Sequence, residues 1–180
     1  MMEIVSFTWP PTRRVTLSAT DDLVTNNSTY ASGFTKAGLP VPPAKKVAVL
    51  ACMDARLDPA KALGLQEGDA HVIRNAGGVA TEDALRSLVI SQRLLGTEEI
   101  ILIHHTGCGM ETFTDDAVKD QILADTGLRP SFALEAFPEV EKDVKQTAAR
   151  LRANPFVPNK NIRGFVYEVE TGKLREVPVD

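Results

Sequence analysis

Three short runs with strand-like composition, separated by segments with helical spacing, constrain the fold of this chain more than any other feature. The runs are 46–52, 71–75 and 99–104, and the first and third are almost continuously apolar. Such runs are typical of strands buried on both faces of a parallel sheet. Between the runs, segments 59–65 and 82–95 have the apolar spacing of helices. This order, joined by right-handed crossovers, predicts an α/β fold with a parallel β-sheet core flanked by helices.

The two ends of the chain extend this core. Residues 1–45 contain five prolines that break long elements, so we expect an N-terminal arm and linker there. Such an arm either wraps a neighbouring subunit or stays disordered. Residues 46–180 are expected to form a single α/β core, which makes the whole chain, 1–180, one domain with an arm. The remaining expected elements are a short helix at 18–30 capped by Ser18 or Thr20, helices at 115–126 and 134–154, and a C-terminal hairpin at 162–177.

Composition excludes several classes of function. Twenty basic and 24 acidic side chains give a net charge of −4 without a block of Lys or Arg, so we expect no nucleic-acid partner. The longest apolar runs are far shorter than a membrane span, and Met1–Pro11 does not resemble a secretory signal. Two cysteines are too few for a disulfide scaffold and fit a reducing compartment, where they serve as buried, metal-bound or catalytic residues. The prediction is a cytoplasmic protein that does not bind membranes.

The residues with the most chemical character follow two of the predicted strands. Cys52 ends the first strand, and His105 and Cys108 come directly after the third. Ligands of open α/β sheets bind beyond the carboxyl ends of the strands, so these side chains meet if the two strands are neighbours. Two thiolates and an imidazole favour zinc, and three protein ligands leave one coordination position open, as in catalytic sites.

Three motifs resemble those of the β-class carbonic anhydrases. They are Cys52-Met-Asp-Ala-Arg56, Arg74-Asn-Ala-Gly-Gly78 and His105-Thr-Gly-Cys108. The resemblance implies an α/β zinc enzyme that assembles as a homodimer or homotetramer. It assigns one zinc ion per chain to Cys52, His105 and Cys108, and a catalytic dyad to Asp54 and Arg56. It also places the turn formed by Asn75, Ala76, Gly77 and Gly78 at the substrate pocket.

The same resemblance implies a reaction. Zinc-activated hydroxide attacks a small linear molecule, and hydration of carbon dioxide to bicarbonate is the first expectation. The compact branch of the family that this chain resembles also includes carbonyl sulfide hydrolases, so release of hydrogen sulfide and carbon dioxide from carbonyl sulfide is the alternative. The commonest motif of the family has Ser where this chain has Ala55. A hydroxyl group near the metal loop is therefore absent.

Other interpretations of the same residues are weaker. Cys52 would be a nucleophile in a phosphatase-like or sulfur-transfer loop, but Arg56 follows it too closely and no glycine-rich cradle surrounds it. A zinc-holding scaffold without turnover is a non-enzymatic alternative. His104 points away from His105 by strand alternation, which predicts packing rather than metal binding.

Overall fold

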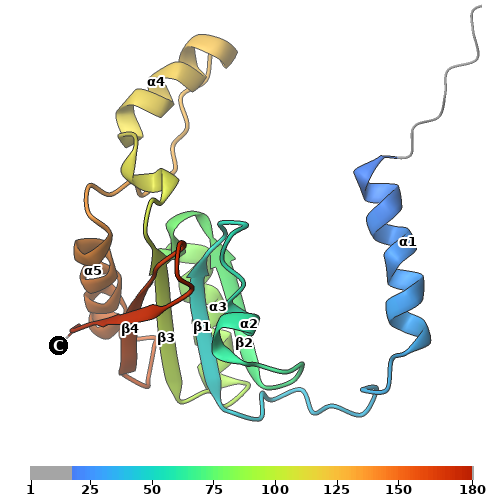
Figure 1. The fold of residues 1–180 in the computed structure, drawn as a ribbon. Coiled ribbons are helices and arrows are strands. Elements are labelled where there is room, and N and C mark those ends of the chain that lie inside the picture. Colours follow the sequence, from blue (N-terminus) through green and yellow to red (C-terminus); the bar gives the residue numbers. More distant parts are fainter. Residues whose placement is uncertain (1–17, 180) are drawn as a thin grey trace, which may run out of the picture. The chain divides into compact units, whose positions relative to one another are not determined.

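The structure is a computed structural model that describes residues 18–179, so the predicted lack of a signal at Met1–Pro11 lies outside the described residues. A five-stranded sheet has the order β2-β1-β3-β4-β5 (Figure 1). Neighbouring strands among the first four are parallel, and β5 is antiparallel to β4, as the predicted core and hairpin require. The strands are β1 (Val47–Cys52), β2 (Ala70–Asn75), β3 (Glu99–His105), β4 (Asn161–Tyr167) and β5 (Leu174–Val177).

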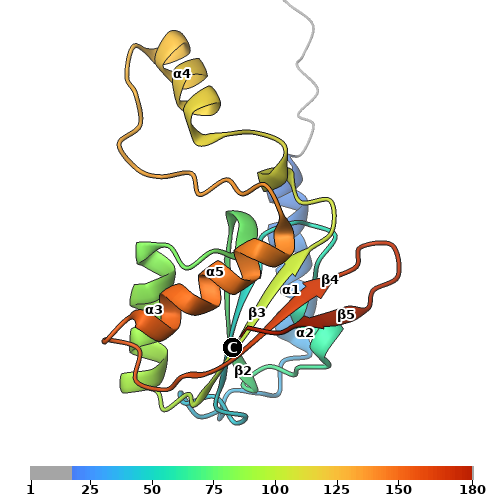
Figure 2. The same cartoon turned by 90° about the vertical axis from the view of Figure 1, so that its left-hand side faces the viewer.

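Helices cover the sheet unequally. The α-helices are α1 (Ala19–Ser32), α2 (Pro59–Leu63), α3 (Glu82–Arg93), α4 (Asp115–Thr126) and α5 (Val140–Ala153), and the short 3-10 helices are η1 (Ala76–Gly78) and η2 (Gly109–Glu111). Helices α3 and α5 lie on one face of the sheet (Figure 2), where Leu88 and Leu151 join Leu50 and Leu102 in one apolar cluster. A second cluster on the other face contains Leu57. It also includes the cysteines of the predicted metal site.

Side-chain caps explain where several helices begin. Ser18 caps α1 through a reciprocal capping box with Asp21, and Asp58 caps α2. Thr81 and Thr114 accept backbone N–H groups at the starts of α3 and α4. The predictions of helices beginning at these positions are confirmed.

Several predicted helix boundaries are wrong. Helix α1 ends at Ser32 rather than at residue 30, and α2 ends at Leu63 rather than at residue 65. Helix α5 begins at Val140 rather than at residue 134. Glu135 has a φ of 63°, outside the helical region, and the amides of Leu134 and Ala136 donate to Asp115 instead of to a helix. Helix α3 ends at Arg93, before the predicted residue 95. The error at the start of α5 comes from apolar spacing that continues through a segment whose hydrogen bonds go elsewhere.

The described residues form two compact units, divided between Leu39 and Pro40, near the predicted limit of the arm. Helix α1, in the first unit, has no buried residue. None of the helices in residues 18–179 is sufficiently long and apolar to span a bilayer.

Candidate metal centre

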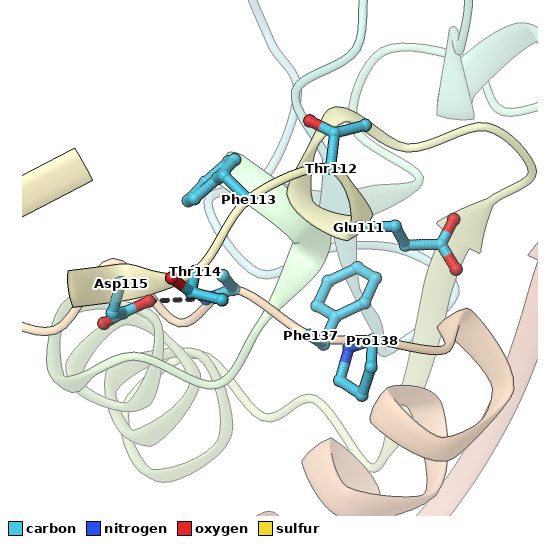
Figure 3. Close-up of a pocket in the computed structure, with 8 residues that line it drawn as sticks. Glu111, Thr112, Phe113, Thr114, Asp115, Phe137 and Pro138 are labelled. Carbon is cyan, nitrogen blue, oxygen red and sulfur yellow. Dashed lines mark hydrogen bonds between the residues drawn. The ribbon is translucent and has the colours of Figure 1, made fainter. Parts of the chain in front are cut away.

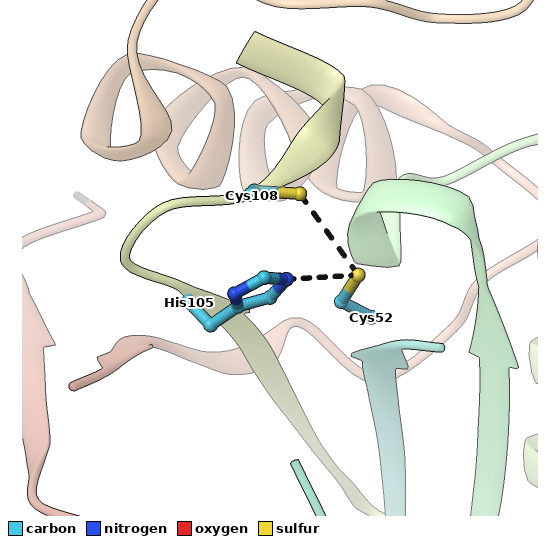
Figure 4. Close-up of side chains that lie close together, drawn as sticks. All are labelled: Cys52, His105 and Cys108. Carbon is cyan, nitrogen blue, oxygen red and sulfur yellow. Dashed lines mark hydrogen bonds between the residues drawn. The ribbon is translucent and has the colours of Figure 1, made fainter. Parts of the chain in front are cut away.

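The ends of β1 and β3 bring three potential metal ligands together (Figure 4). The two strands are parallel neighbours, so Cys52 at the end of β1 lies beside the loop that follows β3. Cys52 Sγ lies 4.0 Å from Cys108 Sγ and 3.2 Å from His105 Nε2. All three donor atoms lie within 4.8 Å of one another, and all three residues are buried. No other group of three His, Cys, Asp or Glu side chains in residues 18–179 has this arrangement.

The separations fit a tetrahedral zinc ion. Zn–S bonds of about 2.3 Å and Zn–N bonds of about 2.05 Å imply an S–S distance of about 3.8 Å and an N–S distance of about 3.6 Å. The distances between Cys52 and its two partners each differ from these values by about 0.4 Å or less, well within a small side-chain adjustment. The donor set, two sulfurs and one imidazole, is also one that zinc prefers.

Hydrogen bonds orient the three potential ligands and shift their pKa values. His105 Nδ1 donates to the carbonyl oxygen of Thr106 at 3.0 Å, which leaves the Nε2 lone pair directed toward the sulfurs. The hydrogen bond between the two thiols lowers the pKa of Cys52 and raises that of Cys108, because the pair keeps one proton between them. Burial lowers the pKa of His105, but its hydrogen bonds with Cys52 and Thr106 outweigh burial and raise it overall. A divalent cation takes the place of these protons, since thiolate and neutral imidazole are the binding forms.

Asp54 and Arg56 form a close pair beside the sulfurs. Arg56 donates from Nε to Asp54 Oδ1 at 2.9 Å and from Nη2 to Oδ2 at 2.7 Å, and its backbone N–H also donates to Oδ1. These bonds hold the pKa of the Asp54 carboxyl well below its usual range. Asp54 Oδ2 lies 3.6 Å from His105 Nε2, and Arg56 Nη2 also donates to the carbonyl oxygen of Gly107. The pair therefore connects the loop after β1 to the loop after β3.

A cavity of about 330 Å³ opens onto the three ligands. Its lining combines the potential ligands and Asp54 with apolar side chains, among them Met53, Ala76, Met110 and Phe113. An apolar chamber with one carboxylate and one metal position suits a small uncharged molecule.

A second cavity, of about 500 Å³, lies at the base of α4 and shares Thr112 and Phe113 with the first (Figure 3). Its two carboxylates already have partners. Glu111 accepts the N–H of Val140, and Asp115 accepts those of Leu134 and Ala136. Backbone amides therefore already bond both carboxylates, and the lining of this cavity contains none of the potential metal ligands, so the chemistry is assigned to the cavity above the cysteines.

The chain is similar to known proteins over most of its length. A model of the carbonic anhydrase family matches residues 47–128. Beta-carbonic anhydrase 1 of Mycobacterium tuberculosis is 57% identical over 162 residues, which cover 89% of this chain and 99% of the relative. The chain belongs to the beta-carbonic anhydrase family. The sequence prediction of this family is confirmed.

Other family members differ in their named activity. A carbon disulfide hydrolase of Acidithiobacillus thiooxidans is 41% identical over 157 residues, covering 75% of this chain and 78% of the relative. The crystal structure of carbonic anhydrase from Streptococcus mutans superimposes with a TM-score of 0.85 at 41% identity, covering 91% of this chain and 99% of that one. The predicted α/β fold is thereby confirmed.

Only part of the turn that was predicted to line the substrate pocket lies in the cavity wall. Ala76 and Gly77 line the cavity of the metal centre. The Asn75 side chain instead donates to the carbonyl oxygen of Val79 and accepts the N–H of the same residue, so it shapes the turn. Gly78 is buried against the backbone of β1, where an added Cβ would lie 2.9 Å from the Cys52 nitrogen.

Sequence reasoning gave no role to Arg74, although it belongs to the second motif. Its guanidinium donates to the carbonyl oxygens of Cys52, Asp54 and Leu57. The only sequence sign of this role is a cationic residue at the strand end beside Cys52, since β1 and β2 pair Ala51 with Arg74.

His104 bonds Asp143 on α5 at 2.7 Å, so the prediction that it packs away from the metal ligands is confirmed.

Proposed function

We propose that this chain is a zinc-dependent carbonic anhydrase, with Cys52, His105 and Cys108 as the ligands of one zinc ion per chain. The observation that carries the proposal is the buried cluster of two thiols and one imidazole at the base of an apolar cavity, beside a carboxylate held by arginine. Zinc bound there supplies a Lewis acid that lowers the pKa of water and provides a nucleophile near neutral pH. The reaction is reversible hydration of carbon dioxide to bicarbonate.

Asp54 and Arg56 are proposed to orient the reaction. Both carboxylate oxygens of Asp54 accept hydrogen bonds from Arg56, so in this arrangement the carboxylate is not free to ligate a metal. With its low pKa it remains a charged acceptor at neutral pH. It is placed to accept a hydrogen bond from the attacking water and so to direct a lone pair of that water toward carbon dioxide. Ala76 and Gly77, in the cavity wall, leave room for the substrate.

Zinc content and stopped-flow hydration of carbon dioxide test this proposal on the same preparation. We expect about one zinc per chain and hydration that disappears when a chelator removes the metal. Active protein without zinc would refute the proposal. Zinc-loaded protein without turnover would favour the scaffold interpretation instead.

Hydrolysis of carbonyl sulfide or carbon disulfide is the second candidate. The carbon disulfide hydrolases among the relatives favour it, as do the apolar side chains around the metal position, because these substrates are also small, linear and uncharged. The metal cannot discriminate among them, since attack on the central carbon is common to all three. Side-by-side rates with carbon dioxide, carbonyl sulfide and carbon disulfide on zinc-loaded protein decide the substrate.

We also propose a cytoplasmic homodimer or homotetramer, built from one domain with an N-terminal arm. Helix α1 supports the assembly: it has 14 residues, none of them buried, and it exposes Leu23, Val24 and Tyr30. A helix of this length is marginal in water without packing, so a second copy is the expected partner. The cytoplasmic location rests on two free cysteines that must stay reduced to bind metal.

Light scattering of the full chain tests the assembly. Leu23→Glu places a charge among the apolar residues of α1, and we expect it to shift the protein toward monomer. Asn26→Glu adds the same charge to the same helix without removing an apolar side chain, and serves as the control. A parent protein that is monomeric and fully active would contradict the proposed assembly.

A further inference from the structure

One guanidinium group gathers three backbone carbonyls of the loop that carries Cys52 and Asp54. Arg74 Nε and Nη2 lie 3.1 and 3.0 Å from the carbonyl oxygen of Cys52. The same Nη2 lies 2.8 Å from the carbonyl oxygens of Asp54 and Leu57. Nη2 has two hydrogens, so the three oxygens share them, and the loop curls around a single cation.

The acceptors connect Arg74 directly to the proposed metal chemistry. Cys52 is a proposed zinc ligand and Asp54 carries the proposed catalytic carboxylate, but Arg74 touches only their backbone. Converging carbonyl dipoles repel one another unless a cation lies between them, so the curl of the loop depends on this side chain. Arg74 does not line the cavity above the ligands, which separates it from a group that contacts substrate.

The loop is held from both sides. Strand β2 anchors Arg74, because its register pairs Arg74 with Ala51 and the N–H of Met53 donates to Asn75 on the same strand. On the other side, Arg56 joins Asp54 to the carbonyl oxygen of Gly107, in the loop that leads to Cys108. Arg74 lies on an edge strand and is exposed to solvent, so its effect comes from the number and direction of its bonds rather than from burial.

We infer that Arg74 is a positioning residue that preorganises the metal-binding loop by fixing the backbone of Cys52 and Asp54. The inference rests on the proposed zinc site. Without the guanidinium, the loop must be ordered when the metal binds, and the Asp54 carboxylate no longer has one direction. Groups that orient metal ligands typically change metal affinity or activity by about 10- to 100-fold when replaced.

Arg74→Lys is the main test variant, because lysine keeps the charge but loses the planar set of donors. Arg74→Gln is the second variant, since it removes the charge as well. Arg93→Lys is the matched control: Arg93 is also exposed and donates to two backbone carbonyls, those of Phe156 and Pro155, which lie outside the metal centre.

The measurements are zinc affinity by competition with a chromophoric chelator, the visible spectrum of the cobalt(II)-loaded protein, and thermal unfolding of the metal-free protein. We expect Arg74→Lys to weaken zinc binding by about 10- to 100-fold and to alter the cobalt bands, with a larger loss in Arg74→Gln. Arg93→Lys should match the parent in both metal measurements, even where its metal-free unfolding temperature falls as much as that of Arg74→Lys.

Two results would overturn the inference. The first is parental zinc affinity and cobalt spectrum in folded Arg74→Lys and Arg74→Gln. The second is a loss of zinc affinity in Arg93→Lys in proportion to its loss of metal-free stability. Such a result would mean that zinc affinity simply reflects the overall stability of the protein. A parent protein that binds no zinc would instead refute the proposed function, so the two failures are distinguishable.

Discussion

Gly78 lies where the backbones of three elements meet, so adding one methyl group there tests how tightly the metal centre is built. An added Cβ would lie 2.9 Å from the Cys52 nitrogen, 3.0 Å from the Ala51 carbonyl carbon and 3.1 Å from the Ile103 oxygen. All three atoms belong to the backbone of β1 or β3, and none can move by a side-chain rotation. The φ of Gly78 is +75°, which also favours glycine.

The expected cost of Gly78→Ala follows from these two features. A residue with a Cβ in the left-handed region costs about 1–2 kcal/mol of unfolding free energy. Overpacking against atoms that cannot yield adds about 1–3 kcal/mol. Gly96→Ala has only the first contribution, because Gly96 has a φ of +72° but no atom within 4 Å of an added Cβ. The difference in stability between the two variants therefore gives the overpacking contribution.

Thermal unfolding of the metal-free proteins measures the difference. We expect Gly78→Ala to be less stable than Gly96→Ala by about 1–3 kcal/mol. For a chain of this size, that difference corresponds to an unfolding temperature about 2–12 °C lower. We also expect weaker zinc binding in Gly78→Ala alone, because the strain falls on the Cys52 nitrogen. Equal unfolding temperatures for the two variants would refute the packing argument.

Three further changes have specific expected outcomes. Cys108→Ser should lose zinc and hydration activity together, since a hydroxyl is a poor zinc ligand at neutral pH; retained zinc by elemental analysis would contradict the ligand assignment. Arg56→Ala should keep zinc but lose activity by about 10- to 100-fold, because Asp54 is released from its two side-chain hydrogen bonds; parental activity from pH 6 to 9 would contradict the dyad. Asp115→Asn should destabilise the protein at neutral pH, because backbone amides hold the pKa of this carboxyl below its usual value. A lowered folded pKa stabilises the protein above the unfolded value of about 3.9, and this stabilisation is lost as the pH falls through the lower folded pKa. Urea unfolding should therefore show the difference from the parent shrinking below about pH 4, and a constant difference would argue against it.

Local patterns were sufficient for most of the elements. Continuous apolar runs at β1 and β3 predicted buried strands because a strand covered on both faces has no polar position. Capping residues such as Ser18 predicted helix starts because they satisfy N–H groups a few residues away. The start of α5 was missed because it depends on a distant residue, Asp115, whose carboxylate accepts hydrogen bonds from the backbone amides of Leu134 and Ala136.

The sequence by itself determined the chemistry of the site. Cysteine, histidine and aspartate at strand ends have donor atoms that only certain metals and reactions use, and parallel strands bring their carboxyl ends to one edge. The tertiary structure alone decided how these residues are held. The three carbonyl oxygens that accept hydrogen bonds from Arg74, and the backbone atoms that contact Gly78, belong to the main chain. Main-chain atoms are the same at every position, so a sequence does not indicate which of them meet. Only the folded positions of β1, β2 and β3 determine which main-chain atoms meet, and therefore how rigidly the metal ligands are placed.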